Sequence, residues 1–142
     1  MREKIKVKIK SPYTLELAKD GDTGYDIKNN GEAQKIEPGK SAIFDSGVSI
    51  EMPKGLDCQV RGRSGLWFKR GVSIGQTGTI DSGYRGNIKV RLVNLSPMTY
   101  VVGRNERIAQ LVFSQHEAPE FEDVFKLSES DRGNGGFGHT GR

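Results

Sequence analysis

The stretch KIKVKIK, residues 4–10, indicates the fold class, because aliphatic side chains and lysines alternate along it without a break. Successive side chains of a strand point to opposite faces of a sheet, so this stretch predicts a strand with one buried and one solvated face. A row of lysines can bind nucleic acid, but it is more commonly a charged edge that resists aggregation. We therefore predict an edge strand here.

Further segments along the chain have the same strand-like character, and turn residues separate them. They span residues 41–44, 47–52, 57–61, 88–94, 107–113 and 121–125. Pro38-Gly39 is a typical turn sequence between two of them. Many short strands at fairly even spacing predict an all-β antiparallel sandwich or jelly roll.

One segment breaks the strand pattern. In SGLWFKRG, residues 64–71, Ser64 can cap the start of a helix and Gly71 can end it. We predict a single short helix there.

Length and composition bound the remaining possibilities. A chain of 142 residues is long enough for one domain. Its 34% hydrophobic residues and 19 glycines predict many turns, with either a core completed by other copies of the chain or a loop-rich monomer. The net charge of +4 suits an anionic small ligand as well as nucleic acid. With Cys58 as the single cysteine, no signal-like segment and no membrane-length run, we expect a soluble protein of a reducing compartment, without a membrane partner.

The Gly-rich end RGNGGFGHTGR, residues 132–142, combines features of a nucleotide site. Glycine backbone can approach a ligand closely, Arg132 offers a planar fork for phosphate, and Phe137 offers a face on which a base can stack. Gly-rich ends are also commonly disordered. The composition alone leaves both interpretations open.

Four internal segments are more specific than simple turns. They are TGYDI (23–27), GRSGL (62–66), GTIDSGYRG (78–86) and ERIAQL (106–111). Together with the Gly-rich end, and in this order, they resemble the five motifs of the trimeric deoxyuridine triphosphate nucleotidohydrolases, the dUTPases. The resemblance runs from Lys4 to Gly141.

The resemblance implies a fold, an assembly and a reaction. The fold would be a distorted, β-clip-like jelly roll over residues 1–126 with a flexible C-terminal lid over 127–142, in a homotrimer with active sites at subunit interfaces. The enzyme would hydrolyse dUTP to dUMP and pyrophosphate with Mg²⁺, keeping uracil out of DNA and supplying dUMP for dTMP synthesis. We expect it in the cytoplasm, or in the host cytoplasm if a phage or virus encodes it.

The resemblance also implies residue roles. Asp81 would orient and deprotonate the attacking water as a general base. Tyr84 would pack under the deoxyribose and leave no room for a 2′-hydroxyl. The uracil edge would be read by backbone groups of Gly75, Gly78, Thr79 and Ile80 and by the main chain of Lys89. Phosphate contacts would come from Arg63, Ser64, Gly65, Arg132, Gly138 and Thr140, and Phe137 would cap the uracil.

Two residues would support the metal site. Asp26 and Gln110 would act on Mg²⁺ through water, since that ion retains several waters and is commonly held by substrate phosphates. Gln110 would also contact the substrate. For Asp26 the alternative is a structural hydrogen bond within a turn.

Four positions depart from the family pattern. His139 stands where the family has Ser, Gly62 where it has Pro, and Trp67 where it has a small residue. Asn105 replaces a Gly, although Asn also tolerates a positive φ. None of these changes removes the expected base, the tyrosine or the phosphate arginines.

Three other functions compete with this one. A dCTP deaminase shares the fold, but that branch carries a Glu where this chain has Arg91. A dUTPase-like fold can also serve as a nucleotide-binding or regulatory module, although Asp81 is retained. Nucleic-acid binding through the basic strand lacks interleaved aromatic residues.

Overall fold

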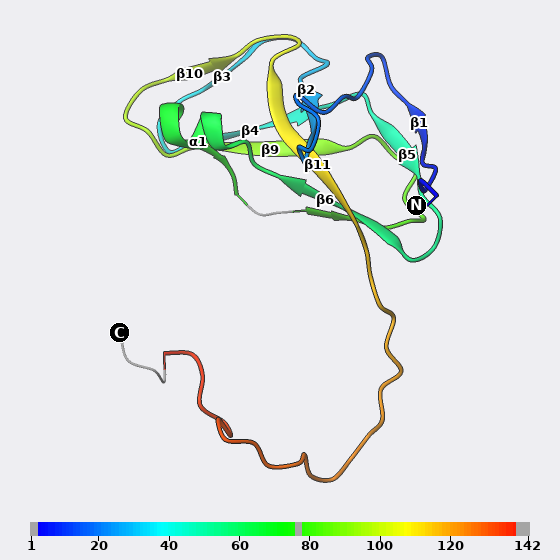
Figure 1. Ribbon diagram of the computed structural model, residues 1–142. Coiled ribbons are helices and arrows are strands. Elements are labelled where there is room, and N and C mark those ends of the chain that lie inside the picture. Colours follow the sequence, from blue (N-terminus) through cyan, green and yellow to red (C-terminus); the bar gives the residue numbers. More distant parts are fainter. Residues whose placement is uncertain (1–2, 76–77, 139–142) are drawn as a thin grey trace.

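The computed structural model describes residues 3–75 and 78–138, and it shows a β-stranded body with one helix (Figure 1). Six strands precede the helix: β1 (Lys8–Lys10), β2 (Tyr25–Lys28), β3 (Gln34–Ile36), β4 (Ser41–Asp45), β5 (Ser49–Glu51) and β6 (Leu56–Arg61). After helix α1 (Ser64–Arg70) come β7 (Val72–Ile74), β8 (Gly78–Ile80), β9 (Lys89–Asn94), β10 (Tyr100–Val102) and β11 (Arg107–Gln115). The all-β prediction with one short helix is confirmed.

Long-range antiparallel pairing builds the body. The largest sheet has the order β2–β11–β6–β8, and β4, β9 and β7 form a second sheet. Two small sheets pair β1 with β5 and β3 with β10. The nine-residue β11 lies between β2 and β6, so it joins segments from both halves of the chain.

The core follows from alternation along these strands. In β9, Val90, Leu92 and Asn94 are buried while Lys89 and Arg91 are exposed. Phe44 from the paired strand β4 is also almost fully buried. Among the described residues, every buried side-chain nitrogen and oxygen atom has a hydrogen-bond partner, which is the condition for burying polar groups at low cost.

The N-terminal strand is shorter than predicted. Only Lys8–Lys10 pair, with Ser49–Glu51 of β5, and residues 4–7 form no strand. The physical reason is that β5 has only three residues and offers no backbone partner further along. The prediction of an edge is confirmed, because β1 has β5 as its single neighbour.

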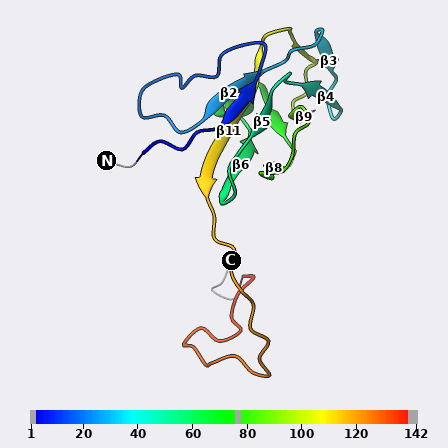
Figure 2. The same cartoon turned by 90° about the vertical axis from the view of Figure 1, so that its right-hand side faces the viewer.

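The strand predicted over residues 121–125 is wrong for the single chain. Phe121, Val124 and Phe125 are exposed, and the chain beyond β11 runs away from the body without helix or strand through residue 138 (Figures 1 and 2). Aromatic and β-branched side chains favour a strand, but a strand forms only where a sheet edge supplies backbone partners. This segment has no such edge within its own described chain. The division into 1–126 and 127–142 stays a prediction.

The helix ends as predicted but begins differently. Gly71 has φ 66°, and its N–H reaches the carbonyls of Leu66 and Trp67. The N-cap, however, is Arg63, with extended backbone and no side-chain cap, while Ser64 is already helical. No helix in the described part of the chain is long and apolar enough to cross a membrane.

Asn94 gives a direct test of this packing. Its buried Nδ2 donates to the carbonyls of Ile36 (2.8 Å) and Met98 (2.7 Å). Asn94→Ala leaves both carbonyls without this donor, and we expect it to lower the free energy of unfolding by roughly 3 kcal/mol. Urea unfolding at fixed protein concentration measures this. Asn87→Ala, at an exposed position, is the control and is expected to change it by less than about 0.5 kcal/mol. Equal effects of the two substitutions would contradict the assigned role of Asn94.

Candidate active site

A polar pocket of about 290 Å³ brings together five of the residues predicted from the sequence. It lies where β2, β11 and the start of α1 meet. Its lining residues are Ala18, Asp22, Thr23, Gly24, Asp26, Arg63, Ser64, Gly65 and Gln110.

Strand register explains why these residues meet. Gln110 on β11 pairs with Asp26 on β2 and with Arg61 on β6, so three strands reach the same level there. Paired residues place their side chains on one face of a sheet. After Arg61 the chain passes Gly62 and begins the helix, which brings Arg63 to the same place.

Ion pairs from two arginines hold the Asp26 carboxylate at the pocket. Arg63 Nε donates to Asp26 Oδ1 at 3.1 Å, and Arg107 lies 3.7 Å from Asp26 Oδ2. The Asp26 side chain is 22% exposed, so this cluster is partly shielded from water. One carboxylate faces two guanidinium groups, and with Asp22, which also lines the pocket, the two positive and two negative side chains balance.

Gln110 and Gly24 depend on each other. Gln110 Nε2 donates to the carbonyl of Gly62 at 3.1 Å, which holds the amide across the pocket. A Cβ atom at position 24 would overlap that amide, so only glycine fits there. Ser64 and Gly65 open α1, and the backbone N–H groups of a first helical turn have no partner within the helix.

A second group of predicted residues lies on β8 and the turn after it. Tyr84 N–H donates to the carbonyl of Asp81 at 3.1 Å, and Tyr84 Oη donates to the carbonyl of Asn87 at 2.9 Å. The Tyr84 ring lies so close to Gly86 that a Cβ there would collide with it. Asp81 is exposed at the head of this turn.

The strand before the turn is tied to β6. Gly78 pairs with Val60 and Ile80 with Cys58, and Thr79 Oγ1 donates to Gln59 Oε1 at 3.0 Å. Burial raises the pKa of the Cys58 thiol to about 12, which keeps it protonated and unsuited to nucleophilic catalysis.

The remaining residues predicted to contact the uracil base lie partly outside the described residues. Gly75 is exposed, and residues 76 and 77 lie outside the described residues. Lys89 begins β9 opposite Asp45 with its side chain exposed.

The two groups lie apart in a single chain. Ile80 is level with Cys58, whereas Arg63 lies beyond the other end of β6. At about 3.3 Å per strand residue, the Asp81 turn and Arg63 are roughly 15–20 Å apart. One chain therefore carries two partial sites that face different places.

The described C-terminal residues, up to Gly138, join neither group of predicted site residues within the chain. Arg132 Nε donates to the carbonyl of Gly135, and Gly133 N–H donates to Ser130 Oγ at 3.1 Å, so both contacts are local. Phe137 is exposed with φ 49°, and Gly138 has φ 95°. Thr140 and His139 lie outside the described residues.

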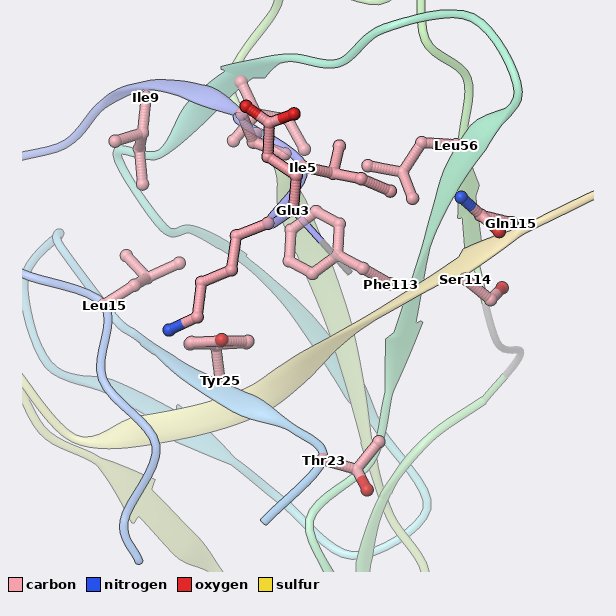
Figure 3. Close-up of a pocket in the computed structure, with 13 residues that line it drawn as sticks. Glu3, Ile5, Ile9, Leu15, Thr23, Tyr25, Leu56, Phe113, Ser114 and Gln115 are labelled. Atoms are coloured by element: carbon pink, nitrogen blue, oxygen red, sulfur yellow. The ribbon is translucent and has the colours of Figure 1, made fainter. Parts of the chain in front are cut away.

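A larger hollow of about 960 Å³ has a different character (Figure 3). Its walls are mostly apolar, with Leu56, Tyr25 and Phe113 turned toward its interior, and the last two rings meet edge to face at 6.0 Å. None of the predicted site residues lines it. Size alone therefore does not identify the active site here.

The sequence did not indicate the role of Arg107. In a regular strand, residues three apart point to opposite faces, so Arg107 and Gln110 are not expected to share a pocket. The register of β11 against β2 shifts between Arg107 and Ala109, and this irregularity turns Arg107 toward Asp26. The tolerance predicted for Asn105 is confirmed, since its φ is 67°.

Metal binding by protein side chains alone finds no support in this geometry. Within residues 3–75 and 78–138, no three His, Cys, Asp or Glu side chains gather where they could hold an ion. Asp26 already has an arginine on each carboxylate oxygen. These residues therefore fit an ion held by phosphate and water and supported indirectly.

Known proteins match the chain along nearly its whole length. The dUTPase family model matches residues 13–141. The deoxyuridine 5′-triphosphate nucleotidohydrolase of Clostridium tetani is 42% identical over 140 residues, covering 98% of this chain and 96% of the relative. That of Chlamydia trachomatis serovar D is 45% identical over 138 residues, covering 94% and 95%.

The fold matches as well. The Staphylococcus bacteriophage 80alpha dUTPase, solved with dUpNHpp, superposes with a TM-score of 0.87 at 28% identity, covering 96% of this chain and 99% of that one. The jelly-roll-like fold expected from the resemblance is thereby confirmed. The chain belongs to the dUTPase family.

Proposed function

We propose that this protein hydrolyses dUTP to dUMP and pyrophosphate. The observation that carries the proposal is the pocket in which Arg63, Ser64 and Gly65 meet Asp26 and Gln110. In a chain of this family, a pocket that holds an arginine and the first backbone N–H groups of a helix suits a triphosphate.

The reaction requires one water and one base. A water oxygen forms a bond to the α-phosphorus while the bond from that phosphorus to the bridging oxygen of the β-phosphate breaks. Asp81 accepts the proton of the water, and pyrophosphate leaves. Arg63 and the first N–H groups of α1 neutralise the phosphate charge. Mg²⁺, when bound, supplies further neutralisation of the phosphates, with Asp26 and Gln110 supporting it through water.

Selectivity lies with the second group of residues. Tyr84, held by its bond to the Asn87 carbonyl, packs under the deoxyribose and excludes a ribose hydroxyl. Backbone groups from Gly75 to Ile80 read the uracil edge, and cytosine would leave buried polar groups unpaired. From the C-terminal segment, Arg132 grips the phosphates and Phe137 covers the base.

The active protein is proposed to be a homotrimer. The separation of the Asp81 turn from Arg63 within one chain supports a site completed by a neighbouring copy. The exposed Phe121, Val124 and Phe125 supply apolar side chains that a neighbour's hollow can bury. Each copy would then lend its C-terminal segment to another.

A hydrolysis panel tests the reaction. With Mg²⁺, we expect pyrophosphate from dUTP at a rate at least about 100-fold above that from dCTP, dTTP or UTP, because the base and sugar contacts reject the other nucleotides. Chelating the metal is expected to lower the rate. Asp81→Asn is expected to lower kcat by about 10²–10⁴-fold with nucleotide binding retained.

The panel also separates the alternatives. Ammonia release from dCTP would indicate a deaminase. Nucleotide binding without pyrophosphate release would indicate a regulatory module.

Mixing two inactive variants tests the shared site. Asp81→Asn and Arg63→Gln impair different partial sites, so a trimer that contains both has some sites with Asp81 and Arg63 intact. After joint refolding at equal amounts, we expect recovery of about a quarter of wild-type activity, as random assembly dictates. Each variant refolded alone serves as the control. If mass measurement shows that mixed trimers have formed and no activity is recovered, Asp81 and Arg63 of one site lie on the same chain.

Shortening the chain tests the lid. A chain that ends at Asp131 lacks Arg132 and Phe137, and we expect kcat/KM for dUTP to fall by at least about 100-fold. The melting temperature is expected to stay unchanged, since the hydrogen bonds described for residues 132–138 are local. Full-length Lys126→Gln, which removes a charge from the same segment, is the control. Full activity of the shortened chain would rule out a catalytic lid.

A further inference from the structure

The turn that carries Asp81 and Tyr84 is shaped by hydrogen bonds within it, among them those that Tyr84 donates to the carbonyls of Asp81 and Asn87. It joins the end of β8 at Ile80 to the start of β9 at Lys89, and most of its residues are exposed. A general base must be held within about 0.5 Å of its productive position. Contacts that tie this turn to the body of the fold therefore bear on catalysis.

Arg85 supplies such a contact. Its Nη1 donates to the carbonyl of Ser82 at 2.7 Å and to the carbonyl of Tyr84 at 3.3 Å. Its Nε lies 3.4 Å from Oε1 of Glu51 on β5. One planar guanidinium thus holds two carbonyls of the turn and fastens them to a strand of the body.

The backbone of Glu51 is held in place, because Glu51 belongs to β5, which pairs with β1. Its Oε2 also lies 3.3 Å from Nζ of Lys8, but the Lys8 side chain is 83% exposed, so water screens this pair. Among the described residues, no hydrogen bond or ion pair joins Lys8 to the turn. A substitution at Lys8 therefore changes the charge beside Glu51 without removing a contact to the turn, whereas a substitution at Arg85 does both.

The exposed fractions of the Arg85 and Glu51 side chains indicate whether their contacts stabilise the fold or position the turn. The Arg85 and Glu51 side chains are 54% and 45% exposed. Exposed ion pairs contribute little to folding stability, because water screens them. A guanidinium fork nevertheless fixes direction as well as distance at each acceptor. The contacts of Arg85 therefore bear on the geometry of the turn more than on the stability of the fold.

We propose that Arg85 is a positioning residue, anchored by Glu51, that sets the shape of the turn presenting Asp81 and Tyr84. The inference rests on the proposed function, in which Asp81 is the base and Tyr84 contacts the sugar. Because Ser82 follows Asp81 directly and the second carbonyl belongs to Tyr84 itself, a change in these carbonyl positions moves the carboxylate and the ring together. Loss of the contact is therefore expected to affect both rate and sugar selectivity.

Arg85→Gln in the full-length protein tests this. We expect kcat for dUTP to fall by about 10- to 100-fold, as a displacement on the order of 1 Å at a reacting group produces. The preference for dUTP over UTP is expected to fall as well. The Kd of a non-hydrolysable dUTP analogue and the melting temperature are expected to stay close to wild type, because the phosphate pocket and the core are untouched.

Two further variants make the result specific. Glu51→Gln removes the anchor and is expected to lower kcat in the same direction by a smaller factor. Lys8→Gln changes the charge beside Glu51 without touching the turn, and wild-type kcat and selectivity are expected. If Arg85→Gln does not fold, Glu51→Gln decides the question by the same measurements.

The contrary outcomes are distinct from failure of the proposed function. Wild-type kcat and selectivity in folded Arg85→Gln, or equal losses in Lys8→Gln, would overturn the positioning role. Inactivity of the wild-type protein toward dUTP, or full activity of Asp81→Asn, would instead overturn the proposed function.

Discussion

The pairing of β11 with β6 is the constraint on which both partial sites depend. Six consecutive residues of β11, Gln110–Gln115, align with six of β6, Arg61–Leu56. One end of this ladder sets Gln110 level with Asp26 and leads the chain into Arg63. Toward the other end, β6 holds β8 and so the turn with Asp81. A one-residue slip would reverse the faces of these side chains and dismantle both groups.

Sequence patterns predicted the parts of the fold where the signal is local. Burial alternates over the six residues of β6 and over the six residues of β9, and Gly71 ends the helix by a conformation that glycine favours. The strands β3 and β10 were missed because each has three residues and exists only through pairing with the other, far along the chain. Residues 121–125 show the reverse error, since strand-favouring aromatic and β-branched residues are present and the partner strand is absent from the described chain.

The residues of the candidate site divide in the same way, into those that sequence motifs indicated and those that only long-range contacts bring into place. The motif order placed Asp26, Arg63, Ser64, Gly65 and Gln110 in one site, and the structure brings them to one pocket. The contact of Arg107 with Asp26 was not predicted from the sequence. The orientation of Arg107 depends on a shift in the pairing register of β11 with β2, which no local sequence pattern indicates. The positioning role of Arg85 was not predicted either, because it depends on contacts with two backbone carbonyls and with Glu51 on the distant strand β5.

In the proposed function, charge pairs already present in the free chain would prepare the pocket for phosphate. Arg63 is held by Asp26, so it has already lost part of the side-chain freedom that binding would otherwise cost. Arg107 brings a second positive charge to the same carboxylate. Asp81, by contrast, lies exposed on a turn fastened by screened contacts. Binding strength and catalytic geometry thus rest on separate parts of the fold, so substitutions at Arg85 and at Arg63 are expected to affect different kinetic constants.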